Sequence, residues 1–474
     1  MVMGEFTQET EVLVIGGGPG GYAAAFRAAD LGLDVTLVDA EGRLGGVCLY
    51  RGCIPSKTLL YVTEMMHDAR RSADMGLIFG EPEVDLEKMR QWKSQVVNRL
   101  AGGLAELCKR RSVQLVAGRA VFEGPGHVRV LGGEVPHIKF RHAILASGSH
   151  AASLPGAEFK KGGRIMGSSG ALALADIPER LLVVGGGYVG VELGSVYASL
   201  GSRVTMVEGL DKLMAGADRD LVHVLQRKLD ELFESIHYRT KVKALEESGD
   251  KVHVTLEGEA DSARQTFDRV LIAIGRRPNS KDLGLENTKV KLDEHGYVVV
   301  DEQMRTADDQ IFAVGDVVGG VMLAHKAMHE GKVAAEVIAG HPSVFDFRAI
   351  PAVVYTDPQI AWCGLTEEQA RKDKRSVKIS RFPWSASGRA ASMGVFQGMS
   401  KLIVDSETNR VLGMGIAGRE AGEMISEGVL AVEMGALAED IALSIHPHPT
   451  LSEGEGEAAE AFLGSSTHIL PLRK

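Results

Sequence analysis

Cysteine is scarce in this sequence, with four among 474 residues. So few cysteines exclude the disulfide framework of a small secreted scaffold. Long apolar runs are also missing, because each run ends before the roughly 18–20 residues that a membrane-spanning helix needs. The N-terminal segment has neither the pattern of a signal peptide nor the Arg-rich composition of a transit peptide. We therefore expect a cytoplasmic protein that makes no contact with a membrane.

Basic residues are fewer than acidic ones, since 53 basic residues against 63 acidic ones give a net charge of −10. No basic patch is dense enough to follow a phosphate backbone, which argues against a nucleic-acid partner. Glycine, in contrast, is abundant, because 57 glycines in this chain exceed the usual share of about 7%. They gather in short runs after apolar segments, which indicates close approach of the backbone to a ligand rather than a flexible chain.

Two parts of the sequence repeat one pattern, in which a G-x-G-x-x-G turn joins a strand to a helix and a second strand ends in an acid. The first has a strand at 12–15, Gly16, Gly18 and Gly21, a helix at 22–31, a strand at 35–38 and Asp39. The second has a strand at 181–184, Gly185, Gly187 and Gly190, a helix at 191–200, a strand at 204–207 and Glu208. Such glycines admit a pyrophosphate, the helix N-terminus stabilises it, and the acid binds a ribose hydroxyl. We therefore predict two Rossmann-like domains.

The acid of the second unit also indicates which nicotinamide cofactor binds there. A carboxylate at Glu208 repels a 2′-phosphate, which a site for NADP would meet with arginine. Arg203 lies before this strand and not after it. The sequence therefore favours NAD over NADP.

Two of the cysteines, Cys48 and Cys53, lie five residues apart after the first unit's acid. In a straight helix their Cα atoms would be ~8.7 Å apart, whereas a disulfide needs about 7 Å or less. A bridge therefore requires a distorted turn, which Gly52 permits. Pro55 suits the first turn of a following helix, so Cys53 would lie near a helix N-terminus, where a thiolate is stabilised. A buried thiol pair or half of a metal site are the alternatives, but no second cysteine pair is near enough for zinc, and we expect no metal.

This cysteine segment resembles the redox-active disulfide of the pyridine nucleotide–disulfide oxidoreductases of the glutathione reductase class. The resemblance extends along nearly the whole chain, through residues 146–149, 187–192, 273–279, 313–316 and 448–450. It implies an α/β fold with two Rossmann-like dinucleotide-binding domains and a C-terminal α+β dimerisation domain in a homodimer. The expected divisions are an FAD-binding domain at 1–150, an NAD-binding domain at 151–277, a segment at 278–350 that completes the FAD domain, and an interface domain at 351–474.

The same resemblance implies two sets of cofactor-binding residues. Those for FAD are Gly16, Gly18, Gly21, Asp39, Gly46, Lys57, Gly118, Ser147, Gly148, Asp316 and Ala324. Those for NAD are Gly185, Gly187, Tyr188, Val189, Gly190, Glu208, Val242 and Gly275. Tyr188 would shield the nicotinamide pocket, or would serve packing alone.

Six residues are expected in the catalytic machinery, namely Cys48, Cys53, Lys57, Glu192, His448 and Glu453. By the resemblance, Lys57 lies near flavin N5 and pairs with Glu192; an exposed helix lysine and an ordinary helix glutamate are the alternatives. His448 acts from the partner subunit as acid–base for the dithiol, and Glu453 orients it; a surface turn fixed by proline is the alternative. Histidine suits the role because it titrates near neutral pH and only a thiolate attacks a disulfide. His446 is expected to be a supporting or structural residue.

Three short segments resemble one group of family members more than the others, and this resemblance predicts the substrate. Residues 323–327, 353–358 and 422–425 look most like members that oxidise a protein-bound dihydrolipoyl group with NAD⁺, in partnership with lipoyl-bearing proteins of 2-oxo acid dehydrogenase or glycine cleavage complexes. An NAD(P)H-dependent reductase of another low-molecular-weight disulfide, and a structural FAD-binding subunit, are the alternatives. Tyr50 and Arg51 replace a smaller pair between the cysteines, and Asp357 stands where a histidine is frequent.

Overall fold

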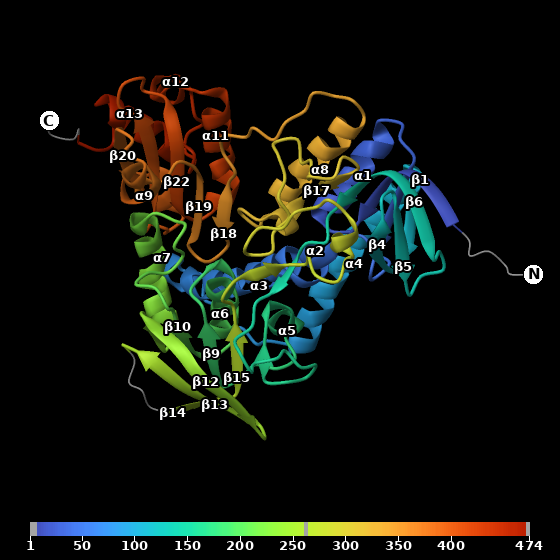
Figure 1. The fold of residues 1–474 in the computed structure, drawn as a ribbon. Helices are drawn as coiled ribbons and strands as arrows, with labels where there is room; N and C mark the ends of the chain where they lie inside the picture. The colour runs from blue at the N-terminus through green and yellow to red at the C-terminus, as the bar shows by residue number, and fades with distance from the viewer. Residues whose placement is uncertain (1–6, 260–263, 471–474) are drawn as a thin grey trace, which may run out of the picture.

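The structure is a computed structural model that describes residues 7–259 and 264–470. It confirms the expected fold class, with two Rossmann-like units and a C-terminal α+β unit (Figure 1). The first six and last four residues lie outside the described residues. They belong to the N-terminal segment considered above and to the ends of the expected domains at 1–150 and 351–474. Within the described ranges, no helix combines the length and the apolar character of a membrane span.

The N-terminal unit is built on a sheet whose parallel strands run in the order β3-β2-β1-β6-β17. Its last strand, β17, comes from beyond the second unit, and near its start β6 also pairs antiparallel with β5. The strands are β1 (Thr7–Ile15), β2 (Val35–Asp39), β3 (Gln114–Ala117), β4 (Arg119–Gly124), β5 (His127–Leu131), β6 (His137–Leu145) and β17 (Ile311–Ala313). The helices are α1 (Pro19–Asp30), α2 (Gly46–Arg51), α3 (Cys53–Arg71), η1 (Ser72–Met75), α4 (Leu86–Arg110), η2 (Leu285–Asn287), η3 (Gly315–Val318) and α8 (Ala324–Ile338).

The second unit repeats this plan with a parallel sheet in the order β11-β10-β9-β15-β8, next to a three-stranded antiparallel sheet, β12-β13-β14. A two-stranded ribbon of β7 (Ser149–Ala151) and β16 (Arg276–Pro278) joins it to the N-terminal unit. The strands are β8 (Ile165–Met166), β9 (Arg180–Val184), β10 (Arg203–Val207), β11 (Ser235–His237), β12 (Thr240–Ser248), β13 (Lys251–Gly258), β14 (Arg264–Phe267) and β15 (Arg269–Ile272). The helices are α5 (Ser168–Ala173), α6 (Tyr188–Ser199) and α7 (Arg219–Leu232).

The C-terminal unit is an antiparallel sheet in the order β18-β19-β22-β21-β20, against which α11 and α13 pack. Its strands are β18 (Ala352–Val354), β19 (Gln359–Gly364), β20 (Val377–Pro383), β21 (Met399–Asp405) and β22 (Val411–Gly418). Its helices are α9 (Glu367–Lys372), η4 (Trp384–Ala386), α10 (Gly388–Ser392), α11 (Ala421–Met434), α12 (Ala438–Leu443) and α13 (Glu453–Leu463). The described strands of this unit pair antiparallel throughout.

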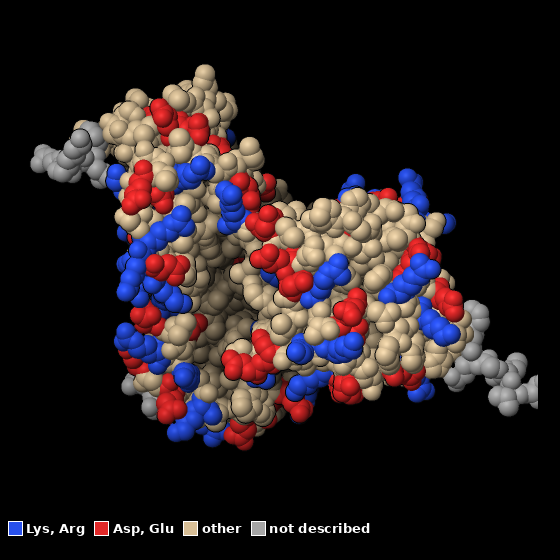
Figure 2. Space-filling model, turned by 45° about the horizontal axis from the view of Figure 1, so that its top comes forward, with Lys and Arg blue, Asp and Glu red and all other residues tan. Residues whose placement is uncertain are grey.

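Helix α3, which begins at Cys53, connects all three units. It packs against α6 of the second unit, and Asp68 near its end accepts hydrogen bonds from Arg419 of the C-terminal unit at 2.9 and 2.7 Å. The cysteine turn therefore lies where the units meet. Figure 2 shows the molecule hollowed between the N-terminal unit and the other two, with side chains of both signs around the rim.

Candidate functional site

A cavity of about 360 Å³ lies between the two Rossmann-like units. It brings together most of the residues expected to hold FAD, and beside them Cys48, Cys53 and part of the second unit's turn. The predicted residues that line it are Gly16, Gly18, Asp39, Gly46, Cys48, Cys53, Lys57, Ser147, Gly148, Tyr188, Val189, Glu192, Asp316 and Ala324. Segments far apart in the sequence therefore form one site.

The two glycine turns have the same geometry. A Cβ on Gly21 would lie 1.8 Å from the carbonyl oxygen of Gly16, and a Cβ on Gly190 would lie 2.0 Å from that of Gly185. Gly16 and Gly185 themselves have φ angles of 110° and 107°, which favour glycine. Larger residues would separate helix from strand in both units. The described backbone at Gly18 and Gly187 starts α1 and α6 without a side-chain cap, which leaves the first N–H groups available to an anion.

The acids that end the second strands also match. Asp39 accepts hydrogen bonds from the N–H groups of Gly17 and Glu41, each at 2.8 Å. Glu208 accepts them from Gly186 at 2.6 Å and Leu210 at 2.8 Å. Each carboxylate is thereby fixed beside its glycine turn, and its remaining lone pairs suit a ribose hydroxyl. The two turns thus fit two dinucleotides.

The cysteine turn interrupts the helix as the spacing required. Helix α2 ends at Arg51 and α3 begins at Cys53, with Gly52 between them. A Cβ on Gly52 would lie 2.9 Å from the carbonyl oxygen of Val47, so the turn is too tight for a side chain there. The cysteines of this turn are free thiols in the structure.

The two thiols are electrostatically different. The hydrogen bond from Cys48 and the nearby Lys57 ammonium lower the pKa of the Cys53 thiol to about 7, although burial opposes them. The same hydrogen bond and burial raise the pKa of Cys48. Cys53 is therefore the better thiolate and the better leaving group of the pair.

Lys57 and Glu192 form an ion pair inside the cavity wall. The Lys57 Nζ atom lies 3.0 and 2.8 Å from the two carboxylate oxygens of Glu192. Glu192 is buried and also accepts a hydrogen bond from the N–H of Tyr355 at 2.9 Å. Burial lowers the pKa of Lys57, but the Glu192 carboxylate outweighs it and the net pKa is raised. The exposed-lysine alternative is thus wrong for this chain.

Asp316 is held by residues that sequence reasoning missed. It accepts a hydrogen bond from Ser149, whose hydroxyl also accepts one from Arg276 at 2.6 Å. The turn that carries Asp316 is fixed from behind, because Glu330 accepts the N–H of Gly315 at 2.8 Å and pairs with the buried Lys326 at 2.5 Å. Lys326 and Glu330 are four residues apart on α8, the spacing of an ion pair on one helix face, and this spacing is the signal that could have found the pair.

Tyr50 and Arg51 also line the cavity, and they contact the loop after β2. Arg51 and Arg43 both pair with Glu41, and the Arg43 guanidinium lies 3.7 Å from the centre of the Tyr50 ring. These contacts tie the cysteine turn to the dinucleotide-binding loop. Asp357 pairs with His67 at 3.3 Å.

His448 and Glu453 meet each other but not the cysteines. The Nδ1 atom of His448 lies 2.7 Å from Glu453, which also accepts the N–H of Thr450 at 2.7 Å. The His448 side chain is 74% exposed. Cys48 and Cys53 line the cavity between the two Rossmann-like units, whereas His448 is not among the described residues that line it. An exposed histidine–glutamate pair thus lies on the C-terminal unit.

Eight predicted cofactor residues lie outside the cavity wall, namely Gly21, Gly118, Gly185, Gly187, Gly190, Glu208, Val242 and Gly275. Gly118 lines an adjoining opening of about 900 Å³ that shares Gly16 and Asp39, and its N–H donates to the Asp39 carbonyl at 2.9 Å. Val242 is half-buried against the core of the second unit. Gly275 follows β15 with a φ of 114°.

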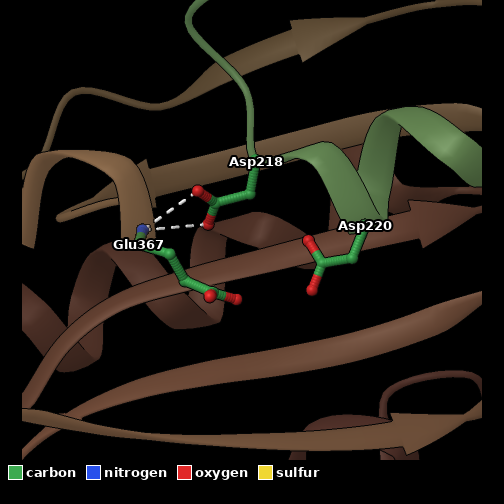
Figure 3. A group of neighbouring side chains, drawn as sticks. All are labelled: Asp218, Asp220 and Glu367. Carbon is green, nitrogen blue, oxygen red and sulfur yellow. Dashed lines mark hydrogen bonds between the residues drawn. The ribbon is translucent and has the colours of Figure 1, made fainter. Parts of the chain in front are cut away.

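Asp218, Asp220 and Glu367 have the spacing of a cation site (Figure 3). They already hold a cation, because the Lys401 ammonium lies 2.7, 3.0 and 2.5 Å from them, and the Lys401 side chain is fully buried. This cluster joins α7 of the second unit to the C-terminal unit.

Replacing Lys401 by methionine is expected to destabilise the protein by about 3–5 kcal/mol, because three carboxylates would keep their charge without the ammonium. The urea midpoint of unfolding measures the loss. Lys228→Met is the matched control, since its pair with Glu231 is exposed and such pairs contribute about 0–1 kcal/mol. Equal midpoints for the two variants would contradict this account.

Comparison with known proteins gives the same result as the geometry. The family model of the pyridine nucleotide-disulphide oxidoreductases matches residues 10–331, and the model of their dimerisation domain matches residues 350–459. The chain belongs to this family.

Relatives match over the full length. The chain is 48% identical to dihydrolipoyl dehydrogenase of Vibrio parahaemolyticus over 98% of both chains, and 45% identical to that of Geobacillus stearothermophilus over 99% of this chain and all of the other. The solved structure of LpdA from Mycobacterium tuberculosis superposes with a TM-score of 0.88 at 26% identity, covering 96% of this chain and 99% of that one.

Proposed function

We propose that this chain is a flavoprotein oxidoreductase that oxidises a protein-bound dihydrolipoyl group to the lipoyl disulfide and reduces NAD⁺ to NADH, with FAD between them. The observation that carries this proposal is the thiol pair, with a low-pKa Cys53, set in the wall of a cavity between two dinucleotide-type turns. The likeness to dihydrolipoyl dehydrogenases supports it. The proposed domain divisions remain 1–150, 151–277, 278–350 and 351–474.

The cofactors fit the residues that would hold them. FAD suits the N-terminal turn, Asp39, and the cavity wall at Lys57, Ser147 and Asp316, since the wall there is polar and charged. NAD suits the second turn and Glu208. When bound, FAD and NAD supply the path by which two electrons leave the dithiol as a hydride.

The chain's own residues carry the dithiol chemistry. The partner subunit's His448 takes a proton from one substrate thiol, and Glu453 stabilises the resulting imidazolium. The substrate thiolate attacks Cys48 of the oxidised pair, which breaks the Cys48–Cys53 bond, and Cys53 leaves as a thiolate beside Lys57. The second substrate thiol then displaces Cys48, which closes the lipoyl disulfide and leaves both cysteines reduced.

A homodimer is part of this proposal. Its support is the dimerisation domain at residues 350–459 and the exposed position of His448. We further propose a cytoplasmic location and lipoyl-bearing proteins of 2-oxo acid dehydrogenase or glycine cleavage complexes as partners.

Steady-state rates test the assignment. The purified protein should form NADH from dihydrolipoamide and NAD⁺, and it should reduce glutathione disulfide with NADPH at a negligible rate. The reverse pattern would favour the alternative reductase of a low-molecular-weight disulfide.

Glu208 should set the choice between NAD⁺ and NADP⁺. A carboxylate repels a 2′-phosphate. Glu208→Gln is therefore expected to lower the preference for NAD⁺ over NADP⁺, measured as the ratio of their kcat/KM values, by roughly tenfold, which is about 1.4 kcal/mol. The glutamine oxygen still accepts one N–H of the turn. Glu234→Gln, a change on the exposed edge of the same unit, is the control, and an unchanged ratio in Glu208→Gln would argue against this role.

A further inference from the structure

Three glutamates at alternate positions of α13 are connected to three histidines. Glu453 contacts His448 at 2.7 Å, and Glu457 contacts His468 at 2.5 Å. Glu455, between them, is connected indirectly: it lies against Glu427 of α11, whose carboxylate is 2.9 Å from Nε2 of His446. His446 precedes the catalytic His448 by two residues.

Glu455 is an unusual acid. It is only 1% exposed, and its carboxyl group meets that of Glu427, so a hydrogen bond between the two needs a proton on one of them; as a carboxylate, neither of its oxygens has a donor among the described residues. Burial, and the negative charge of Glu427, raise the pKa of Glu455 to about 9. An unpaired carboxylate in such surroundings is very costly, so the side chain is a neutral acid at neutral pH.

The other charged groups around α13 leave Glu455 and Glu427 as the interacting pair. The Cys363 thiol of β19 feels the charge of Glu455, but burial raises the pKa of Cys363 to about 12 and keeps it neutral. The charged side chains on the other elements near α13 have other partners. Lys378 lies over the Phe462 ring, and Arg381 and Lys401 contact Asp220. The Asp440 carboxylate accepts a hydrogen bond from the Leu437 N–H, and the Glu433 carboxylate accepts one from the Arg348 N–H.

The His446 ring is held on several sides. Its Nδ1 atom is 3.0 Å from the carbonyl oxygen of Ser444, and its Nε2 atom faces Glu427. The hydrogen bond to Glu427 raises the pKa of His446, because the carboxylate favours the charged form of the ring. A Cβ on Gly456 would lie 3.0 Å from Nδ1, which shows that the ring packs directly on α13 beside Glu455.

We propose that Glu455 and Glu427 are positioning residues that hold His446, and through Pro447 the catalytic His448, and that this support works only while Glu455 is uncharged. The proposal rests on the function assigned to His448 above. When Glu455 loses its proton, two neighbouring carboxylates repel each other in a buried place, and Glu427 moves together with the ring that it holds. Dithiol oxidation then falls, whereas steps that do not need His448 continue.

The test is Glu455→Gln in the full-length FAD-loaded protein, because the amide imitates the neutral acid at all pH values. In the wild type, kcat with dihydrolipoamide and NAD⁺ should fall above about pH 9 by roughly tenfold per pH unit. In Glu455→Gln the fall should begin at least one pH unit higher. NADH oxidation by a quinone, which does not need His448, should show the same pH profile in both proteins.

Glu457→Gln is the matched control, since it changes an acid of the same helix that pairs with His468, and its profile should follow the wild type. An unshifted alkaline fall in Glu455→Gln would overturn the proposal. Failure of the wild type to oxidise dihydrolipoamide at any pH would instead overturn the proposed function. If Glu455→Gln does not fold, the infrared carbonyl band of a protonated carboxyl group decides: the wild type should lose one such band near pH 9, and the lack of that titration would overturn the proposal.

Discussion

Cys53→Ser should abolish the oxidation of dihydrolipoamide, with a loss of at least about a thousandfold in kcat. A serine hydroxyl forms no disulfide, so the substrate thiolate has no bond to attack. Because the pKa of Cys53 is lowered to about 7, the Cys53 sulfur released on reduction stays largely a thiolate above that pH, and the wild-type rate should rise from pH 6 to pH 8 as the reduced enzyme holds more of this thiolate. NADH formation from dihydrolipoamide measures both effects.

The cofactor sites should survive this change. Cys53→Ser is expected to keep its FAD and to oxidise NADH with a quinone, because neither needs the thiol pair. Cys108→Ser is the matched control: Cys108 is buried in the core of the N-terminal unit and donates to the carbonyl of Val113, so its replacement should leave dithiol oxidation unchanged. Full dithiol activity in Cys53→Ser would show that the cysteine pair is not the redox group.

His448→Gln should lower kcat with dihydrolipoamide by about 10²–10⁴-fold, the usual contribution of a general acid–base. Glutamine fills a similar space but takes no proton from the thiol. Quinone reduction by NADH should be unaffected. His468→Gln, which removes another histidine paired with a glutamate of α13, should leave both activities near the wild-type values. A loss below tenfold in His448→Gln would mean that another group takes the proton.

A mixed dimer tests where His448 acts. One subunit carries Cys53→Ser and the other carries His448→Gln. If each site combines the cysteines of one chain with the partner subunit's His448, one of the two sites is intact and the mixed dimer should show about half of the wild-type activity. Activity no higher than that of either parent would place the histidine and the cysteines of a working site on the same chain.

The parts of the fold that follow from local pattern could be predicted. The turns at Gly16 and Gly185 were recognisable because a strand, three glycines and a helix occupy a fixed spacing, and the structure shows the same close approach in both. The break at Gly52 followed from helix geometry, since two cysteines five apart cannot meet in a straight helix.

The parts that depend on distant pairing could not be predicted. Lys401 meets Asp220 across 181 residues, and Arg276 meets Ser149 across 127. Nothing in the local sequence marks such partners, because a lysine in a strand is ordinarily exposed. Glu455 was part of an acidic run typical of a solvated helix face, yet the packing of α13 against the sheet buries it. The roles of the individual site residues stay predictions.

Anaerobic addition of dihydrolipoamide to the purified FAD-loaded protein, followed by NAD⁺, tests the central claim most directly, with the visible flavin spectrum as the record. Dihydrolipoamide alone should change the flavin spectrum promptly after mixing. NAD⁺ should then restore the spectrum of the oxidised flavin, and one NADH should form for each flavin that is reoxidised. No spectral change with dihydrolipoamide, in a protein whose flavin NADH readily reduces, would contradict the assigned dithiol substrate.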